Sequence, residues 1–123
     1  MNEHTIVYRQ IHPSFVQDGF PTSQAFRPTP KDEFQLSVYD GDMITPVAAW
    51  DHYTRDLGLR SCGVMGISIG ECHAVSIDVR SAPEQFAEHA ILDFTGLTDN
   101  ECRSKSKILQ SKARVRGWLF RSE

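Results

Sequence analysis

The chain has 123 residues, of which 40% are hydrophobic and 24% charged, and its formal net charge is −3 at neutral pH. These values are typical of a globular domain with one core, and they exclude a disordered or a fibrous chain. Because the whole chain is slightly acidic, it offers no overall attraction for nucleic acid or for an anionic membrane. Neither is therefore expected as a partner.

The distribution of apolar residues and cysteines indicates where the protein resides. The N-terminus is polar, and no apolar run approaches the roughly 18 residues that span a bilayer. The three cysteines lack a CxxC spacing. We therefore expect a cytoplasmic protein with reduced thiols and without a secretory leader. No metal or cofactor is expected, because no common zinc spacing relates Cys62, Cys72, His73 and Cys102.

The first part of the chain is expected to form β-structure and ordered turns. Residues 5–11 are rich in β-branched and aromatic side chains, and residues 34–38 alternate between apolar and polar, so each should form a strand. Residues 22–26 are expected to form a short strand before a bend. Arg9 falls between two apolar residues on one strand face, which places it either at a sheet edge or in a polar site.

The middle of the chain carries a well-marked helix and a buried strand. Thr45 suits the N-cap and Pro46 the first helical position, so the pattern predicts a helix over residues 46–57. Residues 62–69 are apolar on both faces, as in a central strand whose glycines allow neighbours to approach closely. One helical turn should follow, and then a strand at 75–79 near a sheet edge.

The last third ends in a second long helix. Residues 84–94 are ambiguous between helix and strand, and we favour a loop that enters a buried strand at about His89. The stretch from Thr98 to Glu101 is a capping box, which predicts a helix over residues 99–115. The apolar segment 118–120 must then dock on the rest of the protein.

These elements predict the fold class. No repeat, linker or low-complexity tract divides the chain, so residues 1–123 should form a single α+β domain. The expected architecture is a mixed or antiparallel sheet of about five strands with two main helices, over residues 46–57 and 99–115.

The polar segment 22–42 is the candidate binding surface. Loops on a rigid scaffold commonly carry function, and prolines stiffen this one. Its cations could hold a phosphate or carboxylate while neighbouring polar groups fix the orientation of the ligand. Alternatively, the same side chains satisfy loop backbone groups or are simply solvated. The candidate ligand- or partner-binding residues are Ser23, Gln24, Arg27, Lys31 and Asp32.

An enzyme is the second hypothesis. No nucleophile elbow is present, but His12 could act as a general acid or base. An arginine at the end of the first strand (Tyr8-Arg9), the pair Thr22-Ser23 and later glutamates resemble the arginine, serine and glutamate motifs of ADP-ribosyltransferases. This resemblance implies a compact transferase that acts on NAD. The enzyme hypothesis also includes a nuclease-like enzyme that acts on a nucleotide, and in either case Arg9, His12 and Ser23 are the candidate catalytic residues.

The sequence thus leaves three functional hypotheses. The leading one is a small binding or accessory module that engages a partner protein or a small anionic ligand through residues 22–42, since no complete catalytic set is present. The enzyme is the alternative. An assembly subunit that associates through residues 118–120 is the third. The basic residues of the last helix are expected to form a solvated face rather than a phosphate-binding one.

Overall fold

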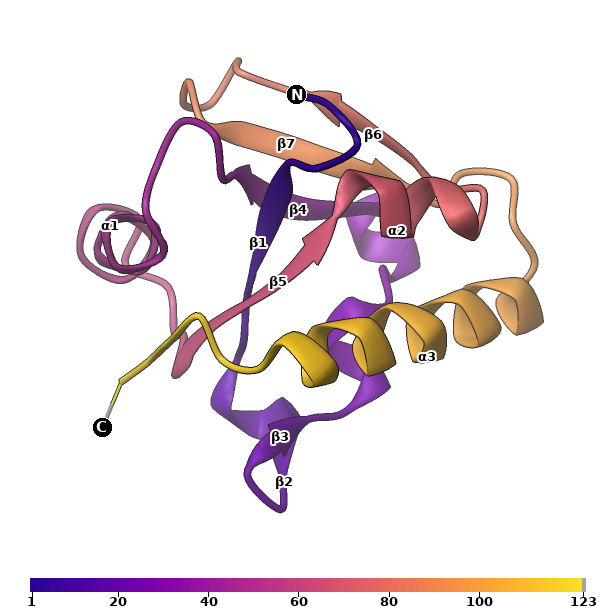
Figure 1. The fold of residues 1–123 in the computed structure, drawn as a ribbon, viewed down its shortest axis with the longest axis horizontal. Coiled ribbons are helices and arrows are strands. Elements are labelled where there is room, and N and C mark those ends of the chain that lie inside the picture. Colours follow the sequence, from indigo (N-terminus) through magenta and orange to yellow (C-terminus); the bar gives the residue numbers. More distant parts are fainter. Residues whose placement is uncertain (123) are drawn as a thin grey trace.

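An antiparallel sheet of six strands forms the centre of the computed structural model, which describes residues 1–122 (Figure 1). The strand order is β6-β7-β4-β1-β5-β8, and a separate two-stranded hairpin pairs β2 with β3. The strands are β1 (Ile6–Gln10), β2 (Val16–Gln17), β3 (Phe20–Pro21), β4 (Gln35–Asp40), β5 (Gly63–Ser68), β6 (Asp78–Ser81), β7 (His89–Asp93) and β8 (Phe120–Arg121).

Helices cover both faces of the sheet. The α-helices are α1 (Pro46–Asp51), which continues as a π-helical turn (His52–Asp56), α2 (Ile69–Ala74) and α3 (Asp99–Arg116). Three short 3-10 helices span Pro13–Phe15, Ser23–Phe26 and Pro30–Asp32. No helix within residues 1–122 is long and apolar enough to cross a membrane.

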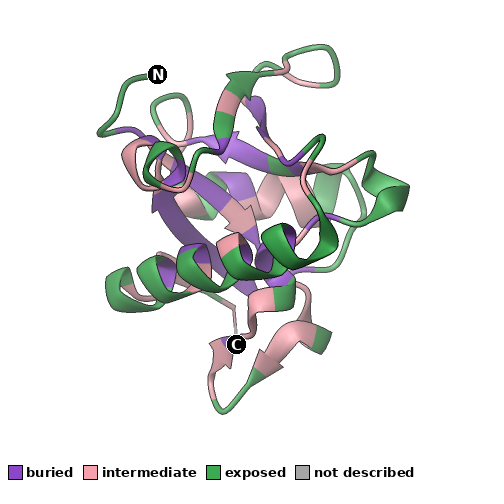
Figure 2. Cartoon of the chain, turned by 90° about the vertical axis from the view of Figure 1, so that its right-hand side faces the viewer, coloured by how far each residue is buried: buried purple, intermediate pink, exposed green. Residues whose placement is uncertain are grey.

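The two sheet faces bury separate apolar cores. On one face Val7 and Ile67 pack with Cys72 of α2 and Leu109 of α3. On the other face the core includes Tyr8, Tyr39, Val64 and Ala49 of α1. The period of two therefore sends neighbouring residues of one strand into different cores. Figure 2 shows the buried strands behind α3, whose outer face is exposed.

Most predicted elements are confirmed. The α+β class, the two main helices, the strand at His89 and the capping box at Thr98 are all present. The predicted close approach of a neighbouring backbone is present at Gly63, where a Cβ atom would lie 2.6 Å from the carbonyl oxygen of Phe120; at Gly66 the close neighbours are the side chains of Leu119 and Ile6. Segment 118–120 docks as predicted, through β8 and its neighbours.

Three expectations are corrected. Residues 22–26 form no strand; Ser23–Phe26 is a 3-10 helix, because Ala25 and Phe26 turn inward into the core. The edge strand lies at 78–81 rather than 75–79, since Ser76 adopts a φ of 60° that ends α2 and interrupts any strand there. The main sheet has six strands rather than about five, because β8 is too short to leave a periodic pattern.

Candidate functional site

The site begins where β1 and β4 part. These strands pair only at Val7 with Asp40 and at Tyr8 with Tyr39. Beyond that point β1 continues along β5, and β4 continues along β7. The two central strands are thus held by different neighbours, and a gap opens between them.

The side chain of Arg9 bridges this gap. Its Nε donates to the carbonyl oxygen of Ala25 at 2.8 Å, and its Nη1 donates to that of Ser37 at 3.0 Å. β1 lies between β4 and β5 in the sheet, but at Arg9 it is paired only with β5 and its β4 side is open. Arg9 lines a pocket, which is the polar-site alternative.

The pocket has a volume of about 250 Å³, and its lining includes residues from both faces of the sheet. Loops from three parts of the chain close it: residues 32–35, the end of the π-helical turn, and residues 85–86. Its walls combine polar side chains with aromatic and aliphatic ones. The lining residues are Arg9, Gln10, Asp32, Gln35, Leu36, Ser37, Val38, Tyr39, Tyr53, Leu57, Leu59, Gln85, Phe86 and His89.

Arg9 is the cation of this pocket. Burial lowers the pKa of its guanidinium, and Tyr53 and Asp32 act in the opposite direction. Within residues 1–122 no carboxylate lies close enough to form an ion pair with it. A partly buried cation without a paired anion is costly for the folded protein, and an anion in the pocket would offset that cost.

Gln10 is the second unusual group. It is 6% exposed, and neither its amide nitrogen nor its amide oxygen has a hydrogen-bond partner among the described residues. Buried polar groups in proteins nearly always have hydrogen-bond partners. A buried carboxamide whose two polar atoms both lack a partner is therefore an exception that needs an explanation. Gln10 belongs to the pocket lining beside Arg9.

Ser37 and His89 form a hydrogen-bonded pair on the sheet. Ser37 lies diagonally across from His89, because β4 pairs Tyr39 with His89 and Ser37 with Ile91. The distance from Ser37 Oγ to His89 Nε2 is 3.1 Å. His89 Nδ1 lies 2.8 Å from the carbonyl oxygen of Ala82. Since a carbonyl can only accept, Nδ1 carries the hydrogen, and in the neutral ring Nε2 accepts from the Ser37 hydroxyl.

Aromatic rings hold this pair in place. Phe86 lies with its ring centroid 5.0 Å from that of His89 and 5.1 Å from that of Tyr39. Tyr39 in turn places its hydroxyl 2.7 Å from His52 Nδ1. Burial, with smaller contributions from nearby Tyr53, Glu88 and Asp56, raises the pKa of Tyr39, so its hydroxyl stays protonated. The imidazole of His89 therefore has little freedom to rotate.

Only part of the sequence-predicted set lines this pocket. Arg9 and Asp32 do, and Asp32 also accepts from Thr29 as the capping residue of a 3-10 helix. His12 caps the 3-10 helix Pro13–Phe15, with its Nδ1 2.8 Å from Ser14 Oγ. The other predicted residues lie in or next to the 3-10 helices and outside the pocket lining: Ser23, Gln24, Arg27 and Lys31.

Sequence reasoning missed Gln10, Ser37 and His89. Ser37 sits in a cleanly alternating strand, where a polar residue is the normal solvent-facing partner of its apolar neighbours. His89 opens a buried strand. The one available signal was that Gln10 shares the inward-facing side of β1 with Tyr8. The proximity of Ser37 to His89 depends on the pairing of strands more than 50 residues apart in sequence, and no local sequence pattern predicts it.

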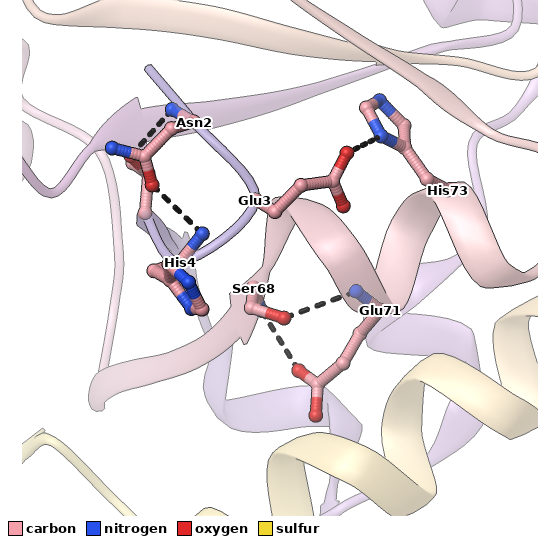
Figure 3. Close-up of polar contacts among 7 residues, drawn as sticks. Asn2, Glu3, His4, Ser68, Glu71 and His73 are labelled. Atoms are coloured by element: carbon pink, nitrogen blue, oxygen red, sulfur yellow. Dashed lines mark hydrogen bonds and ion pairs between the residues drawn. The ribbon is translucent and has the colours of Figure 1, made fainter.

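A second polar cluster joins the N-terminus to α2 (Figure 3). Glu3 Oε1 lies 2.6 Å from His73 Nδ1, and Ser68 and Glu71 form the capping box of α2. Each of these contacts has a structural role, either tethering the chain start or capping a helix. Within residues 1–122, no group of three or more histidine, cysteine or acidic side chains is arranged to hold a metal ion.

Comparison of the chain with protein-family models, with curated proteins and with solved structures gave no match. The function is therefore argued from the pocket.

Proposed function

We propose that the domain binds a small ligand carrying a carboxylate or phosphate group, with that group held by Arg9 and Gln10. The lining residues from Asp32 to Tyr39 belong to the polar segment 22–42. That segment therefore contributes one wall of the pocket. In this proposal the pocket holds a small molecule, and the segment does not bind a partner protein.

The orphan carboxamide of Gln10 carries the proposal. A buried hydrogen-bonding group without a partner costs about 1–3 kcal/mol, so a sequence selected for stability alone would place an apolar residue there. Gln10 lines the same pocket as Arg9. Both amide atoms are themselves buried, so a ligand recovers this cost only when the Gln10 side chain turns its amide toward the pocket.

The chemistry of the walls narrows the ligand class. Nε and Nη1 of Arg9 are engaged with carbonyls, whereas Nη2 donates to no atom of residues 1–122. This donor and the Gln10 amide suit the oxygens of an anion. Phe86 and Tyr39 provide an aromatic wall for the remainder. The volume of about 250 Å³ lies just below the usual range of ligand pockets, about 300–1,000 Å³, which limits the ligand to a small metabolite.

A cytoplasmic location belongs to the same proposal. Cys62, Cys72 and Cys102 are all free, as is usual where thiols are kept reduced.

Thermal-shift measurements test the proposal with defined probes: inorganic phosphate, pyrophosphate, acetate, succinate, AMP and NAD. A probe at one hundred times its Kd should stabilise the protein by about 2.7 kcal/mol. Arg9→Met should abolish the probe-induced shift because it removes the cation. Arg27→Met and Lys31→Met are matched controls, since both remove a cation outside the pocket lining.

The wild-type protein provides an independent readout, because Arg9→Met also removes two hydrogen bonds and can lower stability by itself. Titration of the best probe into isotope-labelled wild-type protein should shift the amide resonances of Ser37, Phe86 and His89. If the resonances of residues 22–31 shift instead, and Arg27→Met abolishes binding, the pocket is not the binding site.

A further inference from the structure

A candidate nucleophile, a base and a group that orients the base are linked by successive hydrogen bonds at the pocket. Ser37 is exposed at the pocket wall, and its Oγ is 3.1 Å from His89 Nε2. The carbonyl of Ala82, 2.8 Å from His89 Nδ1, fixes the tautomer in which Nε2 is the acceptor. The order of groups is that of a serine–histidine catalytic arrangement, with a backbone carbonyl in place of the usual carboxylate.

The surroundings match the other needs of acyl transfer. The Arg9 guanidinium is hydrogen-bonded to the backbone of Ser37 itself, so a cation lies beside the candidate nucleophile. Gln10 belongs to the same lining, and its orphan amide, whose atoms are buried, would reach the pocket when the side chain turns. Donors of this kind stabilise the oxyanion that forms when a carbonyl is attacked.

We propose that this pocket is a hydrolytic site for small carboxylic esters, with Ser37 as the nucleophile and His89 as the general base. The inference rests on the proposed ligand class, because the carboxylate released by hydrolysis is the anion that Arg9 and Gln10 hold.

The reaction proceeds in two balanced steps. Ser37 Oγ attacks the ester carbonyl carbon as its proton passes to His89 Nε2, and the bond to the alkoxy oxygen breaks when His89 returns that proton to the departing alcohol. Water then attacks the acyl-serine and gives a proton to His89. The bond from the acyl carbon to Oγ breaks, Oγ recovers the proton, and a carboxylic acid leaves.

The chain offers a matched control for the nucleophile. Ser14 Oγ lies 2.8 Å from His12 Nδ1 and is exposed, so it is a second serine hydrogen-bonded to a histidine. It lies outside the pocket lining, without Arg9 or Gln10 beside it. A serine that reacts only because a histidine is near would react at both positions.

The first experiment treats the wild-type protein with a fluorophosphonate, which phosphonylates activated serines with loss of fluoride, and maps the product by peptide mass spectrometry. We expect modification at Ser37 at least tenfold faster than at Ser14. Ser37→Ala should abolish it and Ser14→Ala should leave it unchanged. Equal labelling of Ser37 and Ser14, or no labelling of Ser37, would overturn the proposal.

The second experiment measures release of p-nitrophenol from p-nitrophenyl acetate. The wild-type protein should release close to one equivalent in a burst, with an acetyl group found on Ser37. His89→Gln should slow the burst at least a hundredfold, and circular dichroism reports whether that variant is folded. Because labelling and burst are both measured on the wild-type protein, an unfolded variant does not remove the test.

Binding and hydrolysis can fail separately. Ser37→Ala keeps Arg9 and Gln10, so it should still give the thermal shift with acetate while lacking the burst. Acetate binding without labelling or burst in the wild-type protein would overturn the hydrolytic site and leave the binding proposal intact. A protein that neither binds the anions nor reacts would overturn both.

Discussion

At the scale of single residues, the site consists of side chains that are poorly suited to stability. Gln10 is buried without partners, and Arg9 is a cation without a paired anion in residues 1–122. Both occupy β1, the strand whose other residues Val7 and Tyr8 are ordinary core. Such local departures from good packing are common at functional sites, where stability is given up for binding.

Replacement of Gln10 by leucine tests whether this residue lowers the stability of the protein and contributes to ligand binding. The variant removes two unsatisfied polar atoms and keeps a similar volume, so the free energy of unfolding should rise by about 1 kcal/mol or more. The thermal shift with the best anionic probe should decrease at the same time. Chemical denaturation gives the first quantity, and a loss of stability on substitution would show that Gln10 is satisfied in solution.

At the scale of elements, strong local signals produced the predicted structures. α3 begins at Thr98, whose side chain accepts from the Glu101 backbone while the Glu101 carboxylate accepts from the Thr98 backbone. α1 begins where Thr45 caps it and Pro46 occupies the first position. Elements whose signals are local could be predicted because the atoms that cause them are neighbours in sequence.

The capping box of α3 predicts a defined loss. Thr98→Ala removes the side-chain acceptor for Glu101 N, so the free energy of unfolding should fall by about 1 kcal/mol. Ser111→Ala is the control, because Ser111 is exposed in the same helix. That control should lie within about 0.5 kcal/mol of wild type. Equal effects of the two variants in urea denaturation would exclude a stabilising cap.

At the scale of the whole molecule, the C-terminal segment joins the two cores. Trp118 packs against the core that α3 covers, and its Nε1 donates to the Gly19 carbonyl at 3.0 Å. Leu119 and Phe120 pack against the opposite core. Residues in and next to the edge strand β8 thus contact both faces of the sheet and link its two apolar cores.

The ionisable groups predict a stability maximum near neutral pH. Hydrogen bonds from Thr95 and then Arg80 lower the pKa of Asp93 to about 2, from an ordinary value of 3.8. Its stabilising effect is therefore complete above pH 3.8 and is lost as the pH falls through 2. It amounts to at most about 2 kcal/mol. Burial raises the pKa of Cys72 to about 12 from 9.0, so stability is lost again as the pH rises from 9 towards 12.

Urea denaturation from pH 2 to pH 10 measures the free energy of unfolding against pH, and so tests the expected loss of stability on the acid limb and on the alkaline limb. Asp93→Asn should flatten the acid limb, because the variant has no carboxylate to protonate, and should leave the alkaline limb unchanged. An acid limb as steep as that of the wild type would assign the loss to other carboxylates, such as Glu71, whose pKa the Arg116 contact lowers against the effect of burial.

The sequence by itself determined the fold class, the two main helices, the buried strands and the position of the polar segment 22–42. These follow from periodicity, caps and turns, which act between residues a few positions apart. Tertiary structure alone decided the site. The parting of β1 from β4 turns Arg9 into a pocket residue, and strand pairing brings His89 to Ser37. Contacts between residues far apart in sequence leave no local pattern, so only the folded chain shows them.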